Sequence, residues 1–396
     1  MAVTASNTLI TPNMLTAKTL QILHQKLNFV GSINREFDPS FAQEGAKIGQ
    51  TLRIRIPNQY TIRQNTMTLA PQNTVENNVT LAVTNISGVD MSFNTTDLTM
   101  SIDRFSERYI EPAAAIIAAD IESRSLLMFQ QIYNQVNGQG AAQTFKNVLT
   151  SRKILLDNLT PQSKQWQLRI NTQDNVDMVD SLKGLFQQST QIANQYIDGV
   201  MGTSAGYEWA ENTHLSTYLR GAATNAYTVT SISGNQLVVG AGTGASNAGD
   251  VFTIQNVFRV HPETKATTNV LQQFVLLSAN AGGVATWTIS PTPVATGGTQ
   301  NVSALPAGGA TIAFAGTLST ASGISLAYHP DAFTFASADL EMPRGVDMAS
   351  RAAKDGISIR LVRQYDISTD FMPTRLDVLW GISVIRPQLA CRLAAN

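Results

Sequence analysis

Apolar residues near the amino terminus recur at the three- and four-residue spacing of an α-helix. Thr11 and Pro12 form a typical helix start, because a hydroxyl accepts a free backbone N–H and proline is tolerated at the first helical position. The apolar spacing continues to Val30, and Gly31 is expected to end the helix. The first predicted element is therefore a helical amino-terminal segment.

Within residues 38–87, the helical pattern gives way to alternation of apolar and polar residues. Two runs, 52–56 and 79–83, alternate in the manner of strands with one buried face. About 20 mostly polar residues join them, and so long a connection is unusual inside a compact domain. We therefore expect a long β-arm that projects and pairs with a neighbouring molecule. A plain hairpin is the alternative.

A helical pattern opens at Pro112 and continues to Val136. Its apolar residues share one stripe, formed by Ile117, Ile121, Met128, Ile132 and Val136. About 25 residues at about 1.5 Å each would give a rod of roughly 37 Å. We therefore predict a long helix over 112–136.

Mixed helix and strand patterns follow. Helices are predicted near 145–156 and 176–188, with a strand at 167–170 between them. Near the carboxyl end, 358–361 and 376–385 are apolar runs of strand type. These stretches predict a mixed α/β region.

The composition shifts sharply at about Ala222. Between residues 222 and 320 only four residues are charged, namely Asp250, Arg259, Glu263 and Lys265. Six β-rich runs recur there, separated by glycine- and proline-containing turns, at 227–232, 236–239, 251–260, 270–277, 284–289 and 311–314. About six strands of this length suit a small barrel or sandwich. We predict an all-β insertion within the α/β region.

Composition narrows the function. Charged residues make up only 14% of the 396 residues, below the roughly 25% usual for soluble domains. A weakly charged surface suits a protein that contacts copies of itself, although some soluble β-rich proteins share it. The net charge is −1 and no basic block is present, so nucleic-acid contact is expected to be weak and sequence-independent. No signal peptide and no membrane span is expected.

Candidate catalytic chemistry is scarce. Cys391 is the only cysteine, so an intramolecular disulfide or a paired-cysteine zinc site cannot form, which fits a reducing cytoplasm. No histidine has metal-site spacing, and His329, before Pro330 and Asp331, is predicted to serve a turn. The glycine-rich run 199–206 lacks the Gly-Lys-Ser/Thr ending of a phosphate loop. We predict no enzyme activity, no cofactor and no metal site.

Several segments, taken in order, resemble one family. They are 112–136, 155–161 with 167–170, 196–207, 249–257, 326–333 and 375–387. Their order and spacing are similar to those of the coat protein of phage P22 and its podovirus relatives, members of the Hong Kong 97 capsid fold. None of these segments encodes chemistry, so the order of the elements carries the resemblance.

The resemblance implies an α+β capsid fold with an inserted all-β, barrel-like domain. The implied domains are an amino-terminal arm (1–37), an extended β-arm or E-loop (38–88), a P-domain with spine helix 112–136 (89–146), a first A-domain part (147–221), the insertion (222–323), a second A-domain part (324–370) and a closing strand (371–396). A major capsid protein would self-assemble into pentamers and hexamers around double-stranded DNA. Such a protein resides in the virion and is assembled in the host cytoplasm.

Candidate contact residues follow from this division. The candidate inter-subunit residues of the arm are Arg53, Arg55, Tyr60 and Arg63. The candidate hinges that flank the arm are Gly31, Gly45 and Gly49. Implied partners are other copies of the chain, a separate scaffolding protein, a portal and decoration proteins. The insertion is poorer in charge than the family leads us to expect, which leaves its contacts open.

Two alternatives come from other classes. A tail or tailspike-type carbohydrate-binding protein would share the wealth of β-strand, glycine and threonine, but not a long helix. A hydrolase with an added β module would need a catalytic cluster, and the sequence shows none.

Overall fold

The computed structural model describes residues 16–21, 23, 27–35, 51–62, 69, 71, 77–94, 109, 111–182, 202–240, 242–354 and 356–395. The chain divides into two units. The first, called here the sheet unit, contains 1–54, 80–125 and 334–383. The second, called the barrel unit, contains 55–79, 126–333 and 384–396. Each unit therefore assembles stretches that lie far apart in the sequence.

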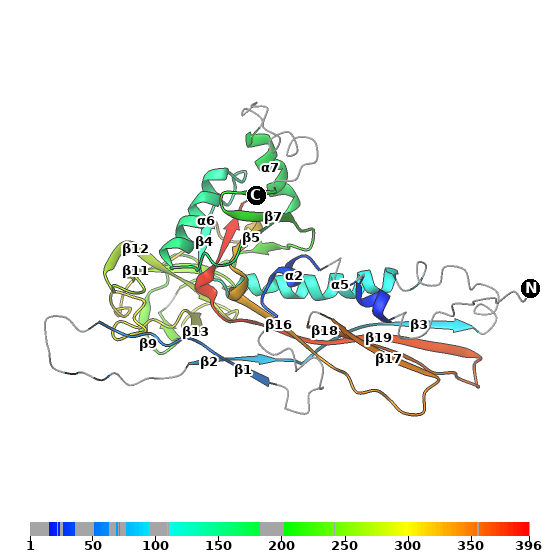
Figure 1. Cartoon of the computed structure of the whole chain (residues 1–396). Coiled ribbons are helices and arrows are strands. Elements are labelled where there is room, and N and C mark those ends of the chain that lie inside the picture. The colour runs from blue at the N-terminus through cyan, green and yellow to red at the C-terminus, as the bar shows by residue number, and fades with distance from the viewer. Residues whose placement is uncertain are drawn as a thin grey trace, which may run out of the picture. The chain divides into compact units, whose positions relative to one another are not determined.

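A five-stranded sheet forms the sheet unit (Figure 1). Its strands are β3 (Asn85–Asn94), β16 (Phe333–Ala338), β17 (Met348–Lys354), β18 (Ile357–Arg363) and β19 (Phe371–Val384). Strand β19 includes most of the apolar run predicted as a strand at 376–385, and Leu376, Val378 and Trp380 are fully buried on one of its faces. The intervening side chains lie on the opposite, outer face, which carries Arg375 and Asp377.

A buried carboxylate anchors the amino-terminal segment to the sheet unit. Helix α5 (Glu111–Leu126) carries Glu122, which is only 1% exposed. Its two oxygens accept hydrogen bonds from the backbone N–H groups of Phe29 and Val30, at the start of helix α2 (Phe29–Ser32). Glu122 thereby places a negative charge at the amino-terminal end of α2, where the backbone N–H groups favour an anion.

The predicted helix over 112–136 is wrong in its second half. Helix α5 ends at Leu126, a 3-10 turn η2 (Leu127–Gln131) follows, and strand β4 (Gln135–Asn137) replaces the last turn. The stripe residues Met128, Ile132 and Val136 are nevertheless buried. A four-residue spacing fits a strand as well as a helix, since four is a multiple of two. Parallel pairing of β4 with β20 (Ala390–Ala394) decides the conformation.

The barrel unit contains a seven-stranded mixed sheet with order β4-β20-β15-β5-β7-β6, in which β8 also pairs with β15. Its further strands are β5 (Trp166–Ile170), β6 (Thr203–Ser204), β7 (Tyr207–Glu211), β8 (Thr217–Leu219) and β15 (Ala321–Tyr328). Helices α6 (Phe145–Asp157) and α7 (Thr172–Leu182) flank it. The predicted helix and strand near 145–156 and 167–170 are confirmed, whereas the second helix begins four residues earlier than predicted.

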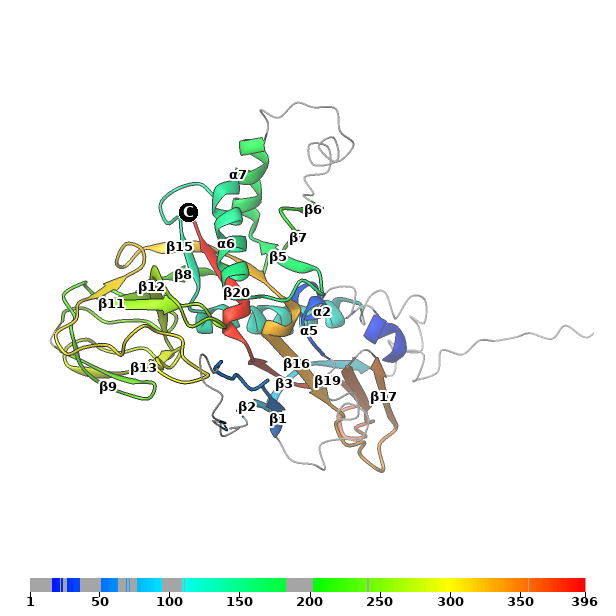
Figure 2. The same cartoon turned by 60° about the vertical axis from the view of Figure 1, so that its left-hand side comes forward.

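Six antiparallel strands form the insertion, in the order β14-β11-β12-β13-β10-β9 (Figure 2). They are β9 (Val229–Ser233), β10 (Gln236–Val239), β11 (Val251–Val260), β12 (Thr267–Leu276), β13 (Ala285–Ser290) and β14 (Ile312–Phe314), close to the six predicted runs. The sheet closes on itself, because Val229 N–H donates to Ala310 O at 2.9 Å and Ile312 N–H donates to Tyr227 O at 3.0 Å. The insertion is therefore a small barrel rather than a sandwich.

Aromatic rings fill the barrel. Phe252 contacts the rings of Phe274, Trp287 and Phe314 at centroid distances of 5.7 to 5.8 Å. Tyr227 packs on Trp287 at 5.0 Å. Five rings supply a core large enough to hold six short strands without a disulfide.

We expect residues 222–323, expressed alone, to fold, because this aromatic core lies within the barrel. Trp287 is the only tryptophan of the fragment and is 1% exposed, so its fluorescence reports folding directly. Urea titration should give a cooperative transition. Phe252→Ala should lower the free energy of unfolding by about 3–5 kcal/mol. A fragment with solvent-exposed Trp287 emission in buffer would contradict this boundary.

Candidate assembly surfaces

The predicted β-arm starts from a two-stranded sheet of β1 (Thr51–Arg55) and β2 (Asn78–Ala82). Ile56 N–H donates to Asn77 O at 2.9 Å and continues the pairing beyond β1. Ile54 and Leu81 are buried, as their alternation predicts. The two strands of the arm are thus confirmed, while its contact with a neighbouring molecule stays a prediction.

Close backbone packing fixes the root of the arm in the sheet unit. A Cβ atom on Gly381 of β19 would lie 2.1 Å from Ala82 O, so only glycine allows this approach. Val83 then packs with Ala338 and Leu379. This contact could not be predicted from the sequence, because a glycine in an apolar strand does not reveal what lies opposite it.

The candidate arm residues lie on exposed positions where the structure describes them. Arg53 and Arg55 lie on β1 at exposed positions flanking buried Ile54. Tyr60 is 58% exposed and its neighbour Ile62 is 79% exposed. Arg63, Gly45 and Gly49 lie outside the described residues. Gly31 lies within α2 with a φ outside the left-handed region, and an added Cβ would meet nothing within 4 Å, so the hinge role stays a prediction.

The barrel unit contacts the arm at Gln59, the residue before Tyr60. A Cβ on Gly298 would lie 2.4 Å from Gln59 O, so the loop after β13 packs directly on the arm. Lys265 holds that loop, because its Nζ donates to Gly298 O at 2.6 Å and to Gln300 O at 3.3 Å. Burial lowers the pKa of Lys265. Within the barrel unit, the loop after β13 therefore supports the arm at Gln59.

A buried cation joins the barrel to its host within the barrel unit. Arg392 of β20 is fully buried, and its Nη2 donates to Gly249 O at 2.6 Å. The guanidinium lies 5.5 Å from the ring centre of Tyr218 and 6.0 Å from that of Phe129. Burial lowers the pKa of Arg392 to about 10. In the sequence, the sign of this buried site is a single arginine within the apolar run 389–395.

Asp250 completes this cluster. Its carboxylate accepts from Tyr218 Oη at 2.7 Å and from the backbone N–H of Gly221 at 3.1 Å. Burial first, and then the charge of Asp250, raise the pKa of Tyr218. The phenol therefore remains a donor at neutral pH. Asp250 thereby ties the start of β11 to the strand that leads into the barrel.

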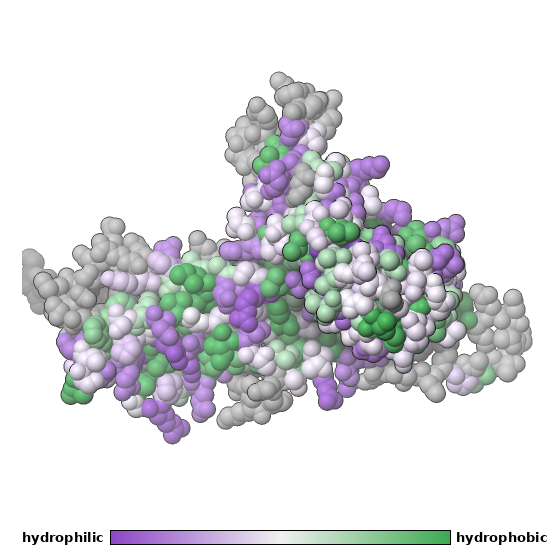
Figure 3. Space-filling model, turned by 180° about the vertical axis from the view of Figure 1, so that it is seen from behind, coloured by the Kyte–Doolittle hydropathy of each residue, from purple (hydrophilic) through white to green (hydrophobic). Residues whose placement is uncertain are grey.

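Two further links hold the barrel to the mixed sheet and its helix. Gln273 of β12 accepts from Gln135 N–H at 2.9 Å and donates back to Gln135 O at 3.0 Å. Arg259 of β11 donates to the Asp157 carboxylate of α6 at 2.9 Å. Arg259 and Lys265 are two of the insertion's four charged residues, and both bind within the subunit. The barrel's surface, on the right in Figure 3, is accordingly mostly of intermediate hydropathy.

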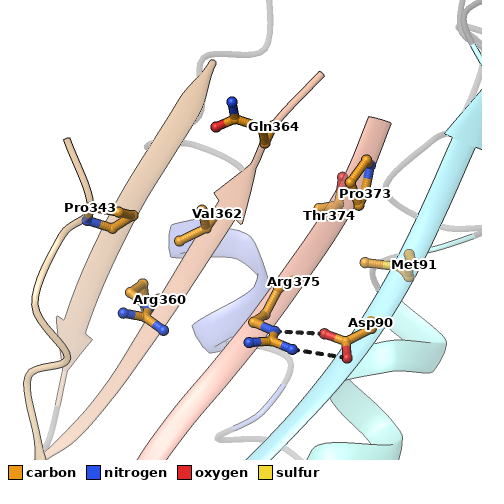
Figure 4. A pocket seen from close by; sticks show the side chains of 9 residues that line it. All are labelled: Asp90, Met91, Pro343, Arg360, Val362, Gln364, Pro373, Thr374 and Arg375. Atoms are coloured by element: carbon orange, nitrogen blue, oxygen red, sulfur yellow. Dashed lines mark hydrogen bonds and ion pairs between the residues drawn. The ribbon is translucent and has the colours of Figure 1, made fainter. Parts of the chain in front are cut away.

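Charged side chains form a ladder on the outer face of the sheet unit. Arg375 donates to Asp90 at 2.8 Å and 3.3 Å, and Arg360 donates to Asp377 at 2.7 Å. The Arg375 hydrogen bond lowers the pKa of Asp90. A Cβ on Gly88 would lie 2.6 Å from the Asp377 carboxylate, so glycine makes room for it. Figure 4 shows the groove beside this ladder, with a volume of about 530 Å³.

The structure describes His329, for which the sequence predicted a turn role. His329 is buried, its Nδ1 accepts from Asp331 N–H at 3.2 Å, and burial lowers its pKa. It caps the turn η3 (Pro330–Ala332), which confirms the predicted turn role. Across the described part of the chain, no group of three or more His, Cys, Asp or Glu residues could hold a metal ion, and no helix is long and apolar enough to cross a membrane.

One protein-family model and several solved structures are similar to this chain. Residues 222–393 match the family model described as P22 coat protein, gene protein 5. The structure of Mycobacterium phage Che8 is similar over 93% of this chain and 90% of that chain, with 11% identity and a TM-score of 0.50. The capsid structure of cyanophage P-SCSP1u is similar over 88% of this chain and 84% of that chain, with 11% identity and a TM-score of 0.44. The CUS-3 coat protein I-domain covers 23% of this chain and 96% of that chain, with 29% identity and a TM-score of 0.18. No curated protein sequence matches.

The fold is the Hong Kong 97 type of phage capsid fold, in the α+β form predicted from the sequence. Within this class the chain resembles the P22 coat protein family of tailed-phage major capsid proteins, whose model it matches through the barrel and the strands that follow. The matched stretch begins at the first residue of the predicted insertion and includes Asp250 and Arg392.

We expect Gly381→Ala to loosen the root of the arm, because the added Cβ would clash with Ala82 O. Trypsin should then cut after Arg53 or Arg55 at least several-fold faster than in the unaltered chain. Gly31→Ala is the matched control, since its Cβ meets open space, and it should leave the cleavage rate unchanged. Equal cleavage of both variants would refute the close-packing argument.

Arg392→Met should destabilise the barrel unit by about 3 kcal/mol, because Gly249 O loses its donor and buried Asp250 loses a nearby positive charge. Urea unfolding followed by circular dichroism measures the change. Lys153→Met removes a cation from an exposed pair with Asp157 and should cost at most about 0.5 kcal/mol. Similar losses in the two variants would show that Arg392 has no special role.

Proposed function

We propose that this chain is a major capsid protein that self-assembles into pentamers and hexamers to form the icosahedral head around the double-stranded DNA of a tailed phage. The observation that carries the proposal is the family match of residues 222–393 within a chain whose fold is a capsid fold. The protein is thus a structural component and not an enzyme.

A shell built from one kind of subunit needs contacts that repeat around closed rings. The arm offers such a contact, since Tyr60, Ile62 and Leu69 are all more than half exposed. Isolated exposed apolar residues are common, but three among the described residues of the arm favour contact with another surface. Strand pairing with a neighbouring copy would add backbone hydrogen bonds to these apolar contacts.

The charge balance suits the packaging of DNA. With 27 basic and 28 acidic residues the chain has no excess of positive charge with which to bind a polyanion tightly. Contact with packaged DNA would be weak and non-specific, which leaves the genome free to be released. Assembly in the host cytoplasm, a separate scaffolding protein, a portal and decoration proteins complete the proposal.

Ile62→Asp should leave the subunit folded and prevent stable shells, because a charge on the arm would be buried against the neighbouring copy. The chain should be expressed with its neighbouring genes and the particles counted by negative-stain electron microscopy. We expect at least a tenfold fall in particle number with an unchanged unfolding midpoint. Ile62→Met is the matched control, since it keeps an apolar side chain of similar size.

The unaltered chain distinguishes the proposal from its rivals. Closed particles support the capsid function. Rods, isolated trimers or a persistent monomer at high concentration would rule it out. Normal shells from Ile62→Asp would leave the capsid function in place and reject the role of the arm.

A further inference from the structure

A small basic pocket lies in the barrel unit, between helix α6 and the turn that joins β6 to β7. Its volume is about 150 Å³. Two cations, two amides, one indole ring and one glycine line it, contributed by Arg152, Gln162, Lys164, Gln165, Trp166 and Gly206. None of these lining residues is a carboxylate, so the positive charge is not balanced within the wall itself. A pocket of this composition favours an anion.

The guanidinium of Arg152 is held in place by three neighbours. Its Nη1 donates to Ala205 O, and its central carbon lies 5.8 Å from the ring centre of Trp166. Trp166 is itself fixed, because its Nε1 donates to Pro161 O at 2.8 Å. A Cβ on Gly206, whose φ is +78°, would lie 1.9 Å from Arg152 Nη1, so glycine leaves the space that the guanidinium occupies. Arg152 is therefore preorganised at the pocket.

The charge of Arg152 is not compensated by a carboxylate in the part of the chain that the structure describes. Its hydrogen-bond acceptor there is the Ala205 carbonyl oxygen, and it forms no ion pair with a described residue. Lys164 differs, because its Nζ pairs with the Asp331 carboxylate at 3.0 Å. Arg152 and Lys164 carry two positive charges and Asp331 one negative charge, which leaves one net positive charge at the pocket. Arg152 is thus the cation that is available to a ligand.

The placement of the donors favours a tetrahedral anion. Arg152 approaches from α6, whereas Gln162, Lys164 and Gln165 lie on the loop between α6 and β5. Gln165 Nε2 donates to Gly206 O at 3.4 Å and has a second N–H, and the Lys164 ammonium has two N–H groups besides the one that faces Asp331. A phosphate presents oxygens in several directions, so it can accept from both sides, and a guanidinium matches two of them.

We propose that this pocket binds a single phosphate group, with Arg152 as its principal cation and Lys164, Gln162 and Gln165 as further donors. Inorganic phosphate and a phosphate of a nucleic-acid strand present the same oxygens, and either source fits this chemistry. The site is independent of the proposed capsid function, because all the residues that form it belong to one subunit.

Isothermal titration calorimetry of the unassembled full-length subunit with inorganic phosphate tests the site. The ionic strength is kept constant with sodium chloride, so that general screening of charge does not contribute. Arg152→Gln should weaken phosphate binding at least about tenfold, since it removes a charge-assisted interaction with the anion. Lys146→Gln is the matched control, because it removes one positive charge from an exposed position of α6 outside the pocket, and it should leave the affinity unchanged.

Two further variants test the geometry, with the fold of each checked by circular dichroism. Arg152→Lys keeps the charge but not the planar guanidinium, so it should recover only part of the affinity that Arg152→Gln loses. Lys164→Gln leaves Arg152 in place and should weaken binding by a smaller factor. This second position keeps the proposal testable if the Arg152 variants do not fold.

The choice of ligand identifies the source of the phosphate. A short single-stranded oligonucleotide whose binding is lost in Arg152→Gln would assign the pocket to nucleic-acid phosphate, and binding of inorganic phosphate alone would assign it to the free ion. Acetate that binds as tightly as phosphate would overturn the tetrahedral assignment. Equal affinities of the unaltered chain, Arg152→Gln and Lys164→Gln, or no binding by the unaltered chain, would overturn the site and leave the capsid function standing.

Discussion

A guanidinium group buried between segments far apart in the sequence holds the barrel in place. Arg392 brings the closing strand β20 against Gly249 at the start of β11 and against the rings of Phe129 and Tyr218. A buried charge is costly unless nearby groups compensate it, and here a carbonyl oxygen, two aromatic faces and the nearby Asp250 carboxylate do so. Specific side-chain contacts therefore hold the insertion against the mixed sheet of the barrel unit.

The sequence predicted the barrel well and the long helix poorly, for one physical reason. The barrel strands can be recognised from two-residue alternation, turn glycines and scarce charge, which are all local signals. The apolar residues Met128, Ile132 and Val136 are also a local signal, but their four-residue spacing fits both a helix and a strand. Only the distant partner β20 decides that Val136 belongs to a strand, and no local pattern contains that information.

The candidate assembly surfaces could likewise be predicted only in part from the sequence. Exposure of Arg53 and Arg55 followed from alternation, since the neighbours of a buried Ile54 in a strand must lie outward. The close packing of Gly381 on Ala82 depends on a contact between residues about 300 positions apart, so it could not be read from either segment. Arg392 was detectable as a lone charge in an apolar run, although its partners were not.

The distribution of charge then separates two kinds of surface. The barrel has few charged residues, and Arg259 and Lys265 among them bind within the subunit, so its exterior has little with which to orient a charged partner. The sheet unit instead displays Asp and Arg pairs across its outer face. Exposed ion pairs add little stability, but complementary charges orient two surfaces as they approach.

Weak, oriented contacts suit a closed shell better than a few strong ones. A preorganised surface loses little conformational entropy on binding, so a small apolar contact can be effective without being irreversible. Each copy would take part in several such contacts, and together they hold a lattice that no single one would stabilise. In the proposed shell a misplaced copy would make fewer contacts and dissociate sooner, so many weak contacts would favour regular closure over disordered aggregation.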